Sequence, residues 1–152
     1  QVILSMAPKI LGVDGSSKMS KSMNNYIGLL ENSDMIWEKL RTAVTDVNRI
    51  RRKDPGDPSV CNIFTIHRAF SPDQTLLDID NGCRTASIGC IDCKKTLFTN
   101  MMEELNPIRE RAESLNNDID YVIDVTKAGA DKCRAIAEKT MDEVRTTIGV
   151  FV

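Results

Sequence analysis

Residues 12–22 read Gly-Val-Asp-Gly-Ser-Ser-Lys-Met-Ser-Lys-Ser, and this stretch divides the chain into two unequal parts. Before it, residues 1–4 (Gln-Val-Ile-Leu) form a short apolar run that is typical of a buried strand. A single buried strand leaves its backbone donors and acceptors without partners. We therefore expect residues 1–4 to be the last strand of a sheet whose other strands precede Gln1, and the chain to be a piece of a longer protein.

The part of the chain after residue 32 predicts helices, because its apolar residues recur at steps of three and four. The first helix follows Ser33 as its N-cap, a second covers residues 59–70, and a third starts at Ser71-Pro72 with the serine as its cap. A helix over 93–105 should end there, and Asn106-Pro107 should start another. The longest series of apolar residues at this spacing runs from residue 118 to 148 and predicts a helix of about eight turns. We expect this helix to pack across the domain, with Cys133 buried on its apolar face.

The composition limits the classes of protein that fit. The chain has 152 residues, of which 41% are hydrophobic, so a disordered or collagen-like chain is excluded. No apolar run approaches the roughly 18 residues of a membrane span, and no signal peptide opens the sequence, so we expect no membrane association and a cytoplasmic location. The net charge of -2 argues against a general nucleic-acid binder but permits a local basic patch.

The loop of residues 12–22 has the chemistry of a phosphate-binding loop. Glycine lets the backbone approach a ligand closely, and backbone N–H groups and lysines suit a polyphosphate. A lysine that meets phosphate as charge develops lowers the barrier by electrostatic stabilisation of the transition state. The alternative is a solvated loop without a ligand.

A family resemblance favours the phosphate loop. Residues 18–22 are the five-residue KMSKS signature of the class I aminoacyl-tRNA synthetases. Residues 8–10, 54–58 (Asp-Pro-Gly-Asp-Pro), 61–64 and 106–111 are similar to segments of the tryptophanyl-tRNA synthetases, in the same order. The chain thus resembles the C-terminal part of that family over nearly its whole length.

The resemblance implies a fold and an activity. Residues 1–32 would be the C-terminal edge of a Rossmann-type α/β catalytic domain, and residues 33–152 a helical anticodon-binding domain, making this piece mostly α-helical. The whole enzyme would use ATP with Mg²⁺ to convert tryptophan to its adenylate and transfer it to tRNA(Trp), as a homodimer. Neither the family's HIGH-like motif nor a tryptophan pocket is found in this chain, so the piece alone should be inactive. Its only histidine, His67, should be a structural or surface residue and not half of a catalytic pair.

The resemblance also assigns roles within the loop. Lys18 and Lys21 would neutralise the β- and γ-phosphates of ATP, with Lys21 the better candidate for the transition state. Ser20 and Ser22 would shape the loop or donate to phosphate, and Met19 would lie near the adenine. Where relatives often have glycine, this chain has Asn24, which also tolerates a left-handed backbone.

Four of the five cysteines form a second candidate site. Cys61, Cys83, Cys90 and Cys93 have the spacing C-x21-C-x6-C-x2-C, and such a set can hold a metal ion or a cluster. The alternative is that they fill a small core as buried apolar residues. Four thiolate ligands alone do not distinguish a zinc site from an iron–sulfur cluster. The resemblance favours a 4Fe–4S cluster over zinc, because a subset of the family carries cysteines at closely similar spacing, and its role would be to tie three helices together.

Basic residues mark a possible tRNA surface. A cationic run covers Arg49, Arg51, Arg52 and Lys53, and Arg109 and Arg111 follow later, but Lys94 and Lys95 beside the last cysteine are the expected anticodon contacts. Two other functions stay open. One is a non-catalytic metal- or cluster-bearing nucleic-acid-binding module, and the other is a different class I synthetase, such as the tyrosyl enzyme.

Overall fold

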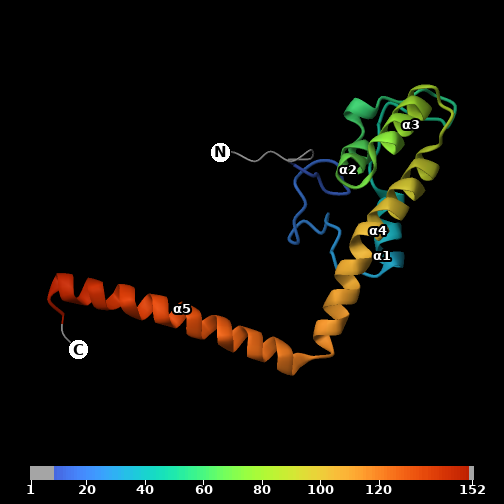
Figure 1. The fold of residues 1–152 in the computed structure, drawn as a ribbon. Coiled ribbons are helices and arrows are strands. Elements are labelled where there is room, and N and C mark those ends of the chain that lie inside the picture. Colours follow the sequence, from blue (N-terminus) through green and yellow to red (C-terminus); the bar gives the residue numbers. More distant parts are fainter. Residues whose placement is uncertain (1–8, 151–152) are drawn as a thin grey trace. The chain divides into compact units, whose positions relative to one another are not determined.

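The computed structural model describes residues 9–150, so the strand predicted for residues 1–4 lies outside the described part. Within that part, Figure 1 shows helices joined by loops, with a long non-helical segment before the first helix. They are α1 (Ser33–Thr42), the short 3-10 helix η1 (Pro58–Val60), α2 (Asn62–Phe70), α3 (Asp73–Arg84), α4 (Cys90–Asn116) and α5 (Ile119–Ile148). The predicted mostly helical fold is confirmed.

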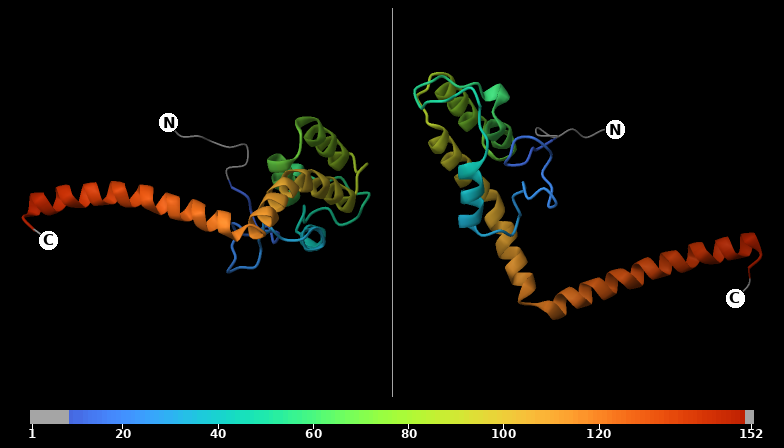
Figure 2. Two further views of the ribbon diagram at one scale, coloured as in Figure 1. Left: turned by 60° about the horizontal axis from the view of Figure 1, so that its bottom comes forward. Right: turned by 180° about the vertical axis from the view of Figure 1, so that it is seen from behind.

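The contacts of the chain divide it into two compact units between Arg109 and Glu110, within α4. This division does not address the predicted domain boundary after residue 32, which stays a prediction. In the first unit, one hydrophobic core contains side chains from α1, α2, α3 and α4. Both views of Figure 2 show α1, α2, α3 and the first part of α4 close together. Its largest fully buried side chains include Ile36, Leu40, Ile63, Ile66, Leu97 and Met101. At the edge of this core, the rings of Trp37 on α1 and Phe98 on α4 meet edge to face, 5.7 Å apart.

Two helix starts differ from the sequence prediction by one residue. The N-cap of α1 is Asn32 and not Ser33, because the Asn32 side chain accepts a hydrogen bond of 2.8 Å from the Met35 backbone N–H. Helix α3 begins at Asp73, with Pro72 and not Ser71 at the cap position. The Ser71 hydroxyl instead contacts His67 and Asn100, so it is already engaged.

The predicted break at Asn106-Pro107 is wrong, since α4 continues through Pro107 to Asn116. Proline has a helical φ but lacks the N–H that would bond to the carbonyl four residues earlier. That residue, Glu103, is exposed, so water can satisfy its carbonyl group. The buried Leu97, Met101 and Leu105 hold the preceding turns of the helix in place.

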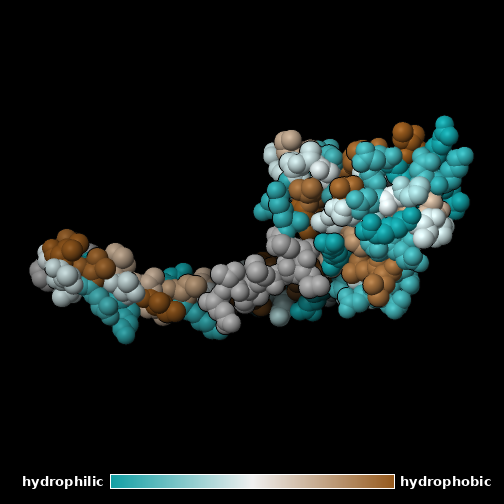
Figure 3. All heavy atoms as spheres, turned by 90° about the horizontal axis from the view of Figure 1, so that it is seen from above, coloured by the Kyte–Doolittle hydropathy of each residue, from teal (hydrophilic) through white to brown (hydrophobic). Residues whose placement is uncertain are grey.

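The second unit contains α5, whose 30 residues match the predicted eight turns. Asp118 caps its start, and Gly149 ends it with a φ of 75°. None of its residues is buried, and Cys133 is exposed, so the expected burial of this stripe and of Cys133 is wrong for the part of the chain described. Figure 3 shows apolar surface open along the helix, which includes Ile119, Ile136, Val144 and Ile148. Across residues 9–150, no helix has the length and apolar character needed to cross a bilayer.

Candidate functional site

The loop of residues 12–22 is an ordered turn. Leu11 and Lys18 form an isolated antiparallel bridge, and the Gly12 backbone N–H donates to the Ser17 carbonyl over 2.7 Å. Both lysines of the signature, Lys18 and Lys21, are exposed to solvent. The loop therefore presents two ammonium groups from a backbone that is held by its own hydrogen bonds.

Asn25, which the sequence analysis did not single out, organises this loop from inside. Its side chain is only 3% exposed. Its Nδ2 donates to the Asp14 carboxylate (3.2 Å) and to the Ser17 hydroxyl (3.1 Å), and its Oδ1 accepts from the Ser20 backbone N–H (2.8 Å). A Cβ on Gly12 would lie 2.4 Å from Asn25 Cγ, so glycine is required there. Periodicity gives no signal for a buried polar residue inside a loop.

Other loop contacts agree with the sequence prediction. Asn24 has a φ of 50°, the left-handed conformation that asparagine tolerates better than most residues. The hydroxyls of Ser20 and Ser22 lie 2.7 Å apart and brace the second half of the signature. Hydrogen bonds chiefly from Ser16, and also from Asn25, hold the pKa of Asp14 below its usual value, so this carboxylate stays charged beside the loop.

The loop is joined directly to the helical part of the first unit. The Asn62 side chain, at the start of α2, donates to the Gly12 carbonyl over 2.8 Å, and this bond is buried. The Val44 backbone N–H, just after α1, donates to the Val13 carbonyl over 2.9 Å. These bonds fix the loop relative to α1 and α2.

The four predicted ligand cysteines all line one small cavity of about 20 Å³. Cys61 caps the start of α2, Cys83 is in the last turn of α3, and Cys90 and Cys93 are in the first turn of α4. The structure thus brings together cysteines from three helices, whereas Cys133 lies on α5. The other residues that line the cavity are Thr45, Asp46, Arg49 and Ile88.

The surroundings of the thiols are apolar but include two nitrogen donors. Arg49 Nη1 lies 3.8 Å from Cys83 Sγ, and His67 Nε2 lies 3.4 Å from Cys93 Sγ. Burial and the neighbouring thiols raise the pKa of Cys93 to about 12, and burial also raises the pKa of Cys83. Without a bound cation, Cys93 is therefore a neutral thiol at pH 7.

Of the two roles predicted for His67, structural or surface, the structure shows the structural one. It is fully buried, and burial lowers its pKa to about 4, so the ring is neutral. Its Nδ1 lies 2.7 Å from the Ser71 hydroxyl, and its Nε2 lies 3.2 Å from the Cys93 carbonyl oxygen. These contacts join α2 to the start of α4.

Gly56 explains why the Asp-Pro-Gly-Asp-Pro segment lies beside the cysteines. A Cβ on Gly56 would be 2.6 Å from Cys83 Sγ and 3.1 Å from Arg49 Cδ. Its backbone N–H donates to the Cys83 carbonyl over 3.0 Å. Only glycine allows this approach, so the segment packs directly against Cys83 and Arg49.

The donor set fits a metal or cluster by its chemistry, since four cysteines from the ends of three helices line one cavity. Its present geometry is not that of a single-ion site: residues 9–150 contain no group of three or more His, Cys, Asp or Glu side chains placed to hold a metal ion. Four thiolates on one zinc would lie about 3.8 Å apart at a Zn–S distance of about 2.3 Å. The cavity has room for about one water molecule, so a larger group would move the thiols outward.

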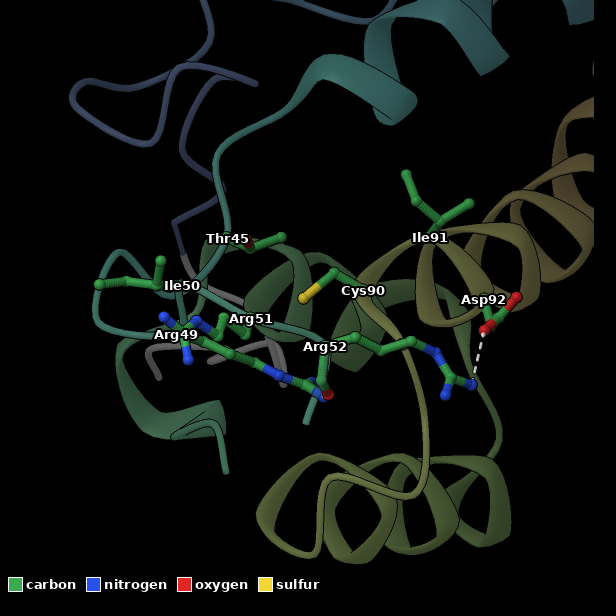
Figure 4. Close-up of a pocket in the computed structure, with 9 residues that line it drawn as sticks. Thr45, Arg49, Ile50, Arg51, Arg52, Cys90, Ile91 and Asp92 are labelled. Carbon is green, nitrogen blue, oxygen red and sulfur yellow. Dashed lines mark hydrogen bonds and ion pairs between the residues drawn. The ribbon is translucent and has the colours of Figure 1, made fainter. Parts of the chain in front are cut away.

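A second pocket, of about 350 Å³, adjoins the cysteine cavity and is cationic (Figure 4). One side is the loop after α1, with Thr45 and residues 49–52, and the other is the start of α4 with residues 89–92. We call it the arginine pocket, after Arg49, Arg51 and Arg52. In Figure 4, Arg52 reaches across toward Asp92, with 3.9 Å between Nη2 and Oδ2.

Lys94 is not available to bind RNA, which corrects the sequence prediction. It is 5% exposed, and its Nζ donates to the carbonyls of Arg41 (2.9 Å) and Ala43 (2.6 Å). These are orphan carbonyls at the end of α1, where a positive charge is favourable. Lys95, one residue later, is exposed. Helical periodicity turns the first side chain into the core and the second toward solvent.

The chain is similar to known proteins over most of its length. The profile of the family described as "tRNA synthetases class I (W and Y)" matches residues 1–106. A tryptophan–tRNA ligase of Deinococcus radiodurans is 54% identical over 143 residues, which are 94% of this chain and 43% of that protein. A tryptophan–tRNA ligase of Thermotoga maritima is 42% identical over 152 residues, which are 99% of this chain and 46% of that protein.

A solved structure shares the fold. The tryptophanyl-tRNA synthetase of Campylobacter jejuni, complexed with ADP and tryptophan, superposes with a TM-score of 0.83 at 26% identity, over 93% of this chain and 43% of that one. The chain therefore spans less than half the length of these relatives. With the family profile covering two thirds of its length, from the signature loop through the cysteine site, the chain belongs to the class I tRNA synthetases (W and Y).

Proposed function

We propose that this chain works as the C-terminal part of a tryptophan–tRNA ligase, which activates tryptophan with ATP and Mg²⁺ and transfers it to tRNA(Trp). The observation that carries the proposal is the loop of residues 12–25, in which a KMSKS segment is held open by a buried asparagine. The relatives that match most of the chain are named tryptophan–tRNA ligases, which favours tryptophan over tyrosine.

Within this proposal the loop acts by electrostatic stabilisation. The carboxylate of tryptophan attacks the α-phosphorus of ATP, and negative charge grows on the leaving pyrophosphate. Lys18 and Lys21 neutralise the β- and γ-phosphates, Ser20 and Ser22 shape the loop, and Met19 lies toward the adenine. Because the lysines are exposed and their loop is braced, little reorganisation is needed when ATP binds.

Pyrophosphate exchange in the full-length enzyme tests this role, since it needs ATP and tryptophan but no tRNA. Lys21→Ala should lower kcat about 10²- to 10³-fold, as loss of one transition-state donor does, with tryptophan affinity nearly unchanged. Lys53→Ala is the matched control, because Lys53 is also exposed but lies outside the loop, and it should leave kcat unchanged. Equal loss of tryptophan binding and kcat in Lys21→Ala would contradict the assigned role.

The helical part of the chain is proposed to bind the anticodon end of tRNA(Trp), and the enzyme to be a homodimer located in the cytoplasm. Exposed basic residues of this part include Arg51, Arg52, Lys53, Lys95 and Arg111. Arginine suits the unpaired bases of an RNA loop, since its planar group both stacks and donates hydrogen bonds.

We further propose that Cys61, Cys83, Cys90 and Cys93 hold a 4Fe–4S cluster, with zinc as the alternative. The support is that all four cysteines line one cavity, although the described residues offer no single-ion geometry. The cluster would supply a cross-link between the ends of α2, α3 and α4, and the cysteines would bind it as thiolates.

Chemical analysis of protein purified without oxygen tests this assignment. Four iron and four sulfide per chain, with brown colour, are expected. Cys90→Ser should lose them, whereas Cys133→Ser, on the exposed face of α5, should keep them. One zinc per chain and no sulfide would establish the alternative.

A further inference from the structure

The loop of residues 12–22 is held at its base by one buried side chain, that of Asn62 in the first turn of α2. This side chain is 6% exposed, and its Nδ2 donates to the Gly12 carbonyl over 2.8 Å. A carbonyl oxygen can only accept, so the nitrogen of the amide is the atom that faces it. The same carbonyl also accepts from the Gly15 backbone N–H over 2.9 Å, so Asn62 holds the turn of residues 12–15.

Gly12 connects this bond to the part of the loop that carries the lysines. Its backbone N–H donates to the Ser17 carbonyl over 2.7 Å, and Leu11 beside it forms the antiparallel bridge with Lys18. Gly12 is thus bonded on one side to α2 and on the other to the residue before Lys18. A shift of Gly12 therefore moves the backbone from which Lys18 extends.

The turn of residues 12–15 lies directly on Asn62 and Val44. A Cβ on Gly15 would be 3.6 Å from Asn62 Cβ and 3.5 Å from Val44 Cβ, which is ordinary van der Waals contact. The second bond that holds the turn runs from the Val44 backbone N–H to the Val13 carbonyl over 2.9 Å and uses backbone atoms alone. Of these two bonds, the one from Asn62 can be removed by changing a side chain.

Stability does not explain why residue 62 carries an amide. Among the described residues, the buried Oδ1 of Asn62 has no hydrogen-bond partner. A buried acceptor without a partner costs free energy, which offsets the gain from the bond that Nδ2 makes. An apolar side chain of similar shape would leave no polar atom of its own unpaired, so the packing of α2 gives no reason for an amide. The bond to the loop gives one.

From these contacts we propose that Asn62 is a positioning residue for the activation of tryptophan. It fixes the base of the loop, so that Lys18 and Lys21 meet the β- and γ-phosphates of ATP in the geometry of the transition state. The inference rests on the proposed function and goes beyond it, because a residue of the helical part takes a role in the ATP reaction. A displaced loop slows the reaction without weakening the binding of tryptophan, since the lysines act on the phosphates.

Tryptophan-dependent pyrophosphate exchange by full-length Asn62→Leu tests this role. Leucine has a similar size and shape but makes no hydrogen bond, so kcat should fall about tenfold, the rate equivalent of one hydrogen bond. The KM for tryptophan should stay the same. The free energy of unfolding, measured with urea, should not fall, because the unpaired Oδ1 is removed together with the donor. Wild-type kcat in this variant would overturn the proposal.

Asn100→Leu is the matched control. It is the same substitution and removes a bond of 2.8 Å from Asn100 on α4 to the Ser71 hydroxyl at the end of α2, away from the loop. Its kcat should equal that of wild type. An equal loss of kcat in Asn100→Leu and Asn62→Leu would show that the bond to Gly12 has no special role.

Limited digestion with trypsin reports on the loop without using activity. Lys18 and Lys21 are exposed within the loop, and Lys53 is exposed outside it. Asn62→Leu should be cleaved several-fold faster after Lys18 and Lys21 but at the wild-type rate after Lys53, as followed by mass spectrometry, because only the loop is loosened. Faster cleavage at all three lysines would indicate a general structural role, and unchanged cleavage would mean that the loop does not depend on Asn62. Either result would overturn the proposal.

Should the leucine variant not fold, Asn62→Ser replaces it, because a serine hydroxyl is too short to reach the Gly12 carbonyl. The same loss of kcat and the same cleavage pattern are expected. Exchange by the wild-type enzyme distinguishes this inference from the proposed function. Absence of tryptophan-dependent exchange rejects the proposed function, whereas normal exchange in wild type and in the Asn62 variants rejects the inference alone.

Discussion

At the residue scale, buried polar side chains hold the segments that carry the exposed charged side chains. Asn25 holds the signature loop open from inside, Lys94 closes the end of α1, and Arg49 joins two cavities. Each makes bonds to groups that are distant in sequence or hidden in a loop. Their neighbours Asn24, Lys95 and Ile50 are exposed, which provides matched controls for each role.

Asn25→Asp keeps the shape of the side chain but replaces its donor with a second carboxylate beside Asp14. We expect a loss of about 1–3 kcal/mol in the free energy of unfolding, the cost of an unmade buried hydrogen bond, and slower pyrophosphate exchange. Asn24→Gly should change both quantities little, because glycine adopts the observed positive φ freely. Equal effects of the two substitutions would show that Asn25 has no special role.

Lys94→Met should lower the free energy of unfolding by about 2 kcal/mol, because two carbonyls at the end of α1 lose a charged donor. Urea unfolding followed by the fluorescence of Trp37, the only tryptophan of the chain, measures the change. Lys95→Met should leave stability within about 0.5 kcal/mol of wild type. If Lys94→Met reduced RNA affinity without changing stability, Lys94 would contact RNA directly, contrary to its burial.

The pH dependence of stability offers a check on the loop. The pKa of Asp14 is lowered, so its contribution to stability is present above the unfolded value of 3.8 and is lost as the pH falls through the folded pKa. Asp14→Asn should therefore differ from wild type in unfolding free energy at pH 7, and the difference should shrink below pH 3.8. A constant difference would mean that the charge of Asp14 has no part in holding the loop.

At the element scale, apolar periodicity predicted the helices well and their ends less well. Steps of three and four identified α1, α2 and the full length of α5, because buried faces repeat with the helix period. The ends depend on single hydrogen bonds, and Asn32 competes for the cap with Ser33 beside it. The sequence predicted that a helix ends before Pro107, but α4 continues through it. Core packing of the turns before Pro107 holds the helix in place, and periodicity does not show this.

Pro107→Ala should restore the missing hydrogen bond to the Glu103 carbonyl and stabilise α4 by about 1–3 kcal/mol. Slower hydrogen exchange of the amides after Pro107 would report this gain. Faster exchange or loss of stability would show that the proline is needed where α4 passes from one compact unit to the other.

At the scale of the whole molecule, the sequence identified the candidate site residues but not the contacts between segments that are distant in sequence. Motif spacing indicated the loop and the four cysteines, and the structure brings those cysteines to one cavity. The arginine pocket was visible only as a charge run, because its second wall comes from residues 89–92. Contacts between such segments depend on packing, which a single sequence does not encode in any local pattern.

Aminoacylation by the full-length enzyme tests the central claim most directly. Purified enzyme is incubated with ATP, Mg²⁺, unfractionated tRNA and either labelled tryptophan or labelled tyrosine. The proposed function predicts that tryptophan is attached to tRNA, that tyrosine is not, and that Lys21→Ala greatly slows the attachment. Attachment of tyrosine, or of neither amino acid, would contradict it.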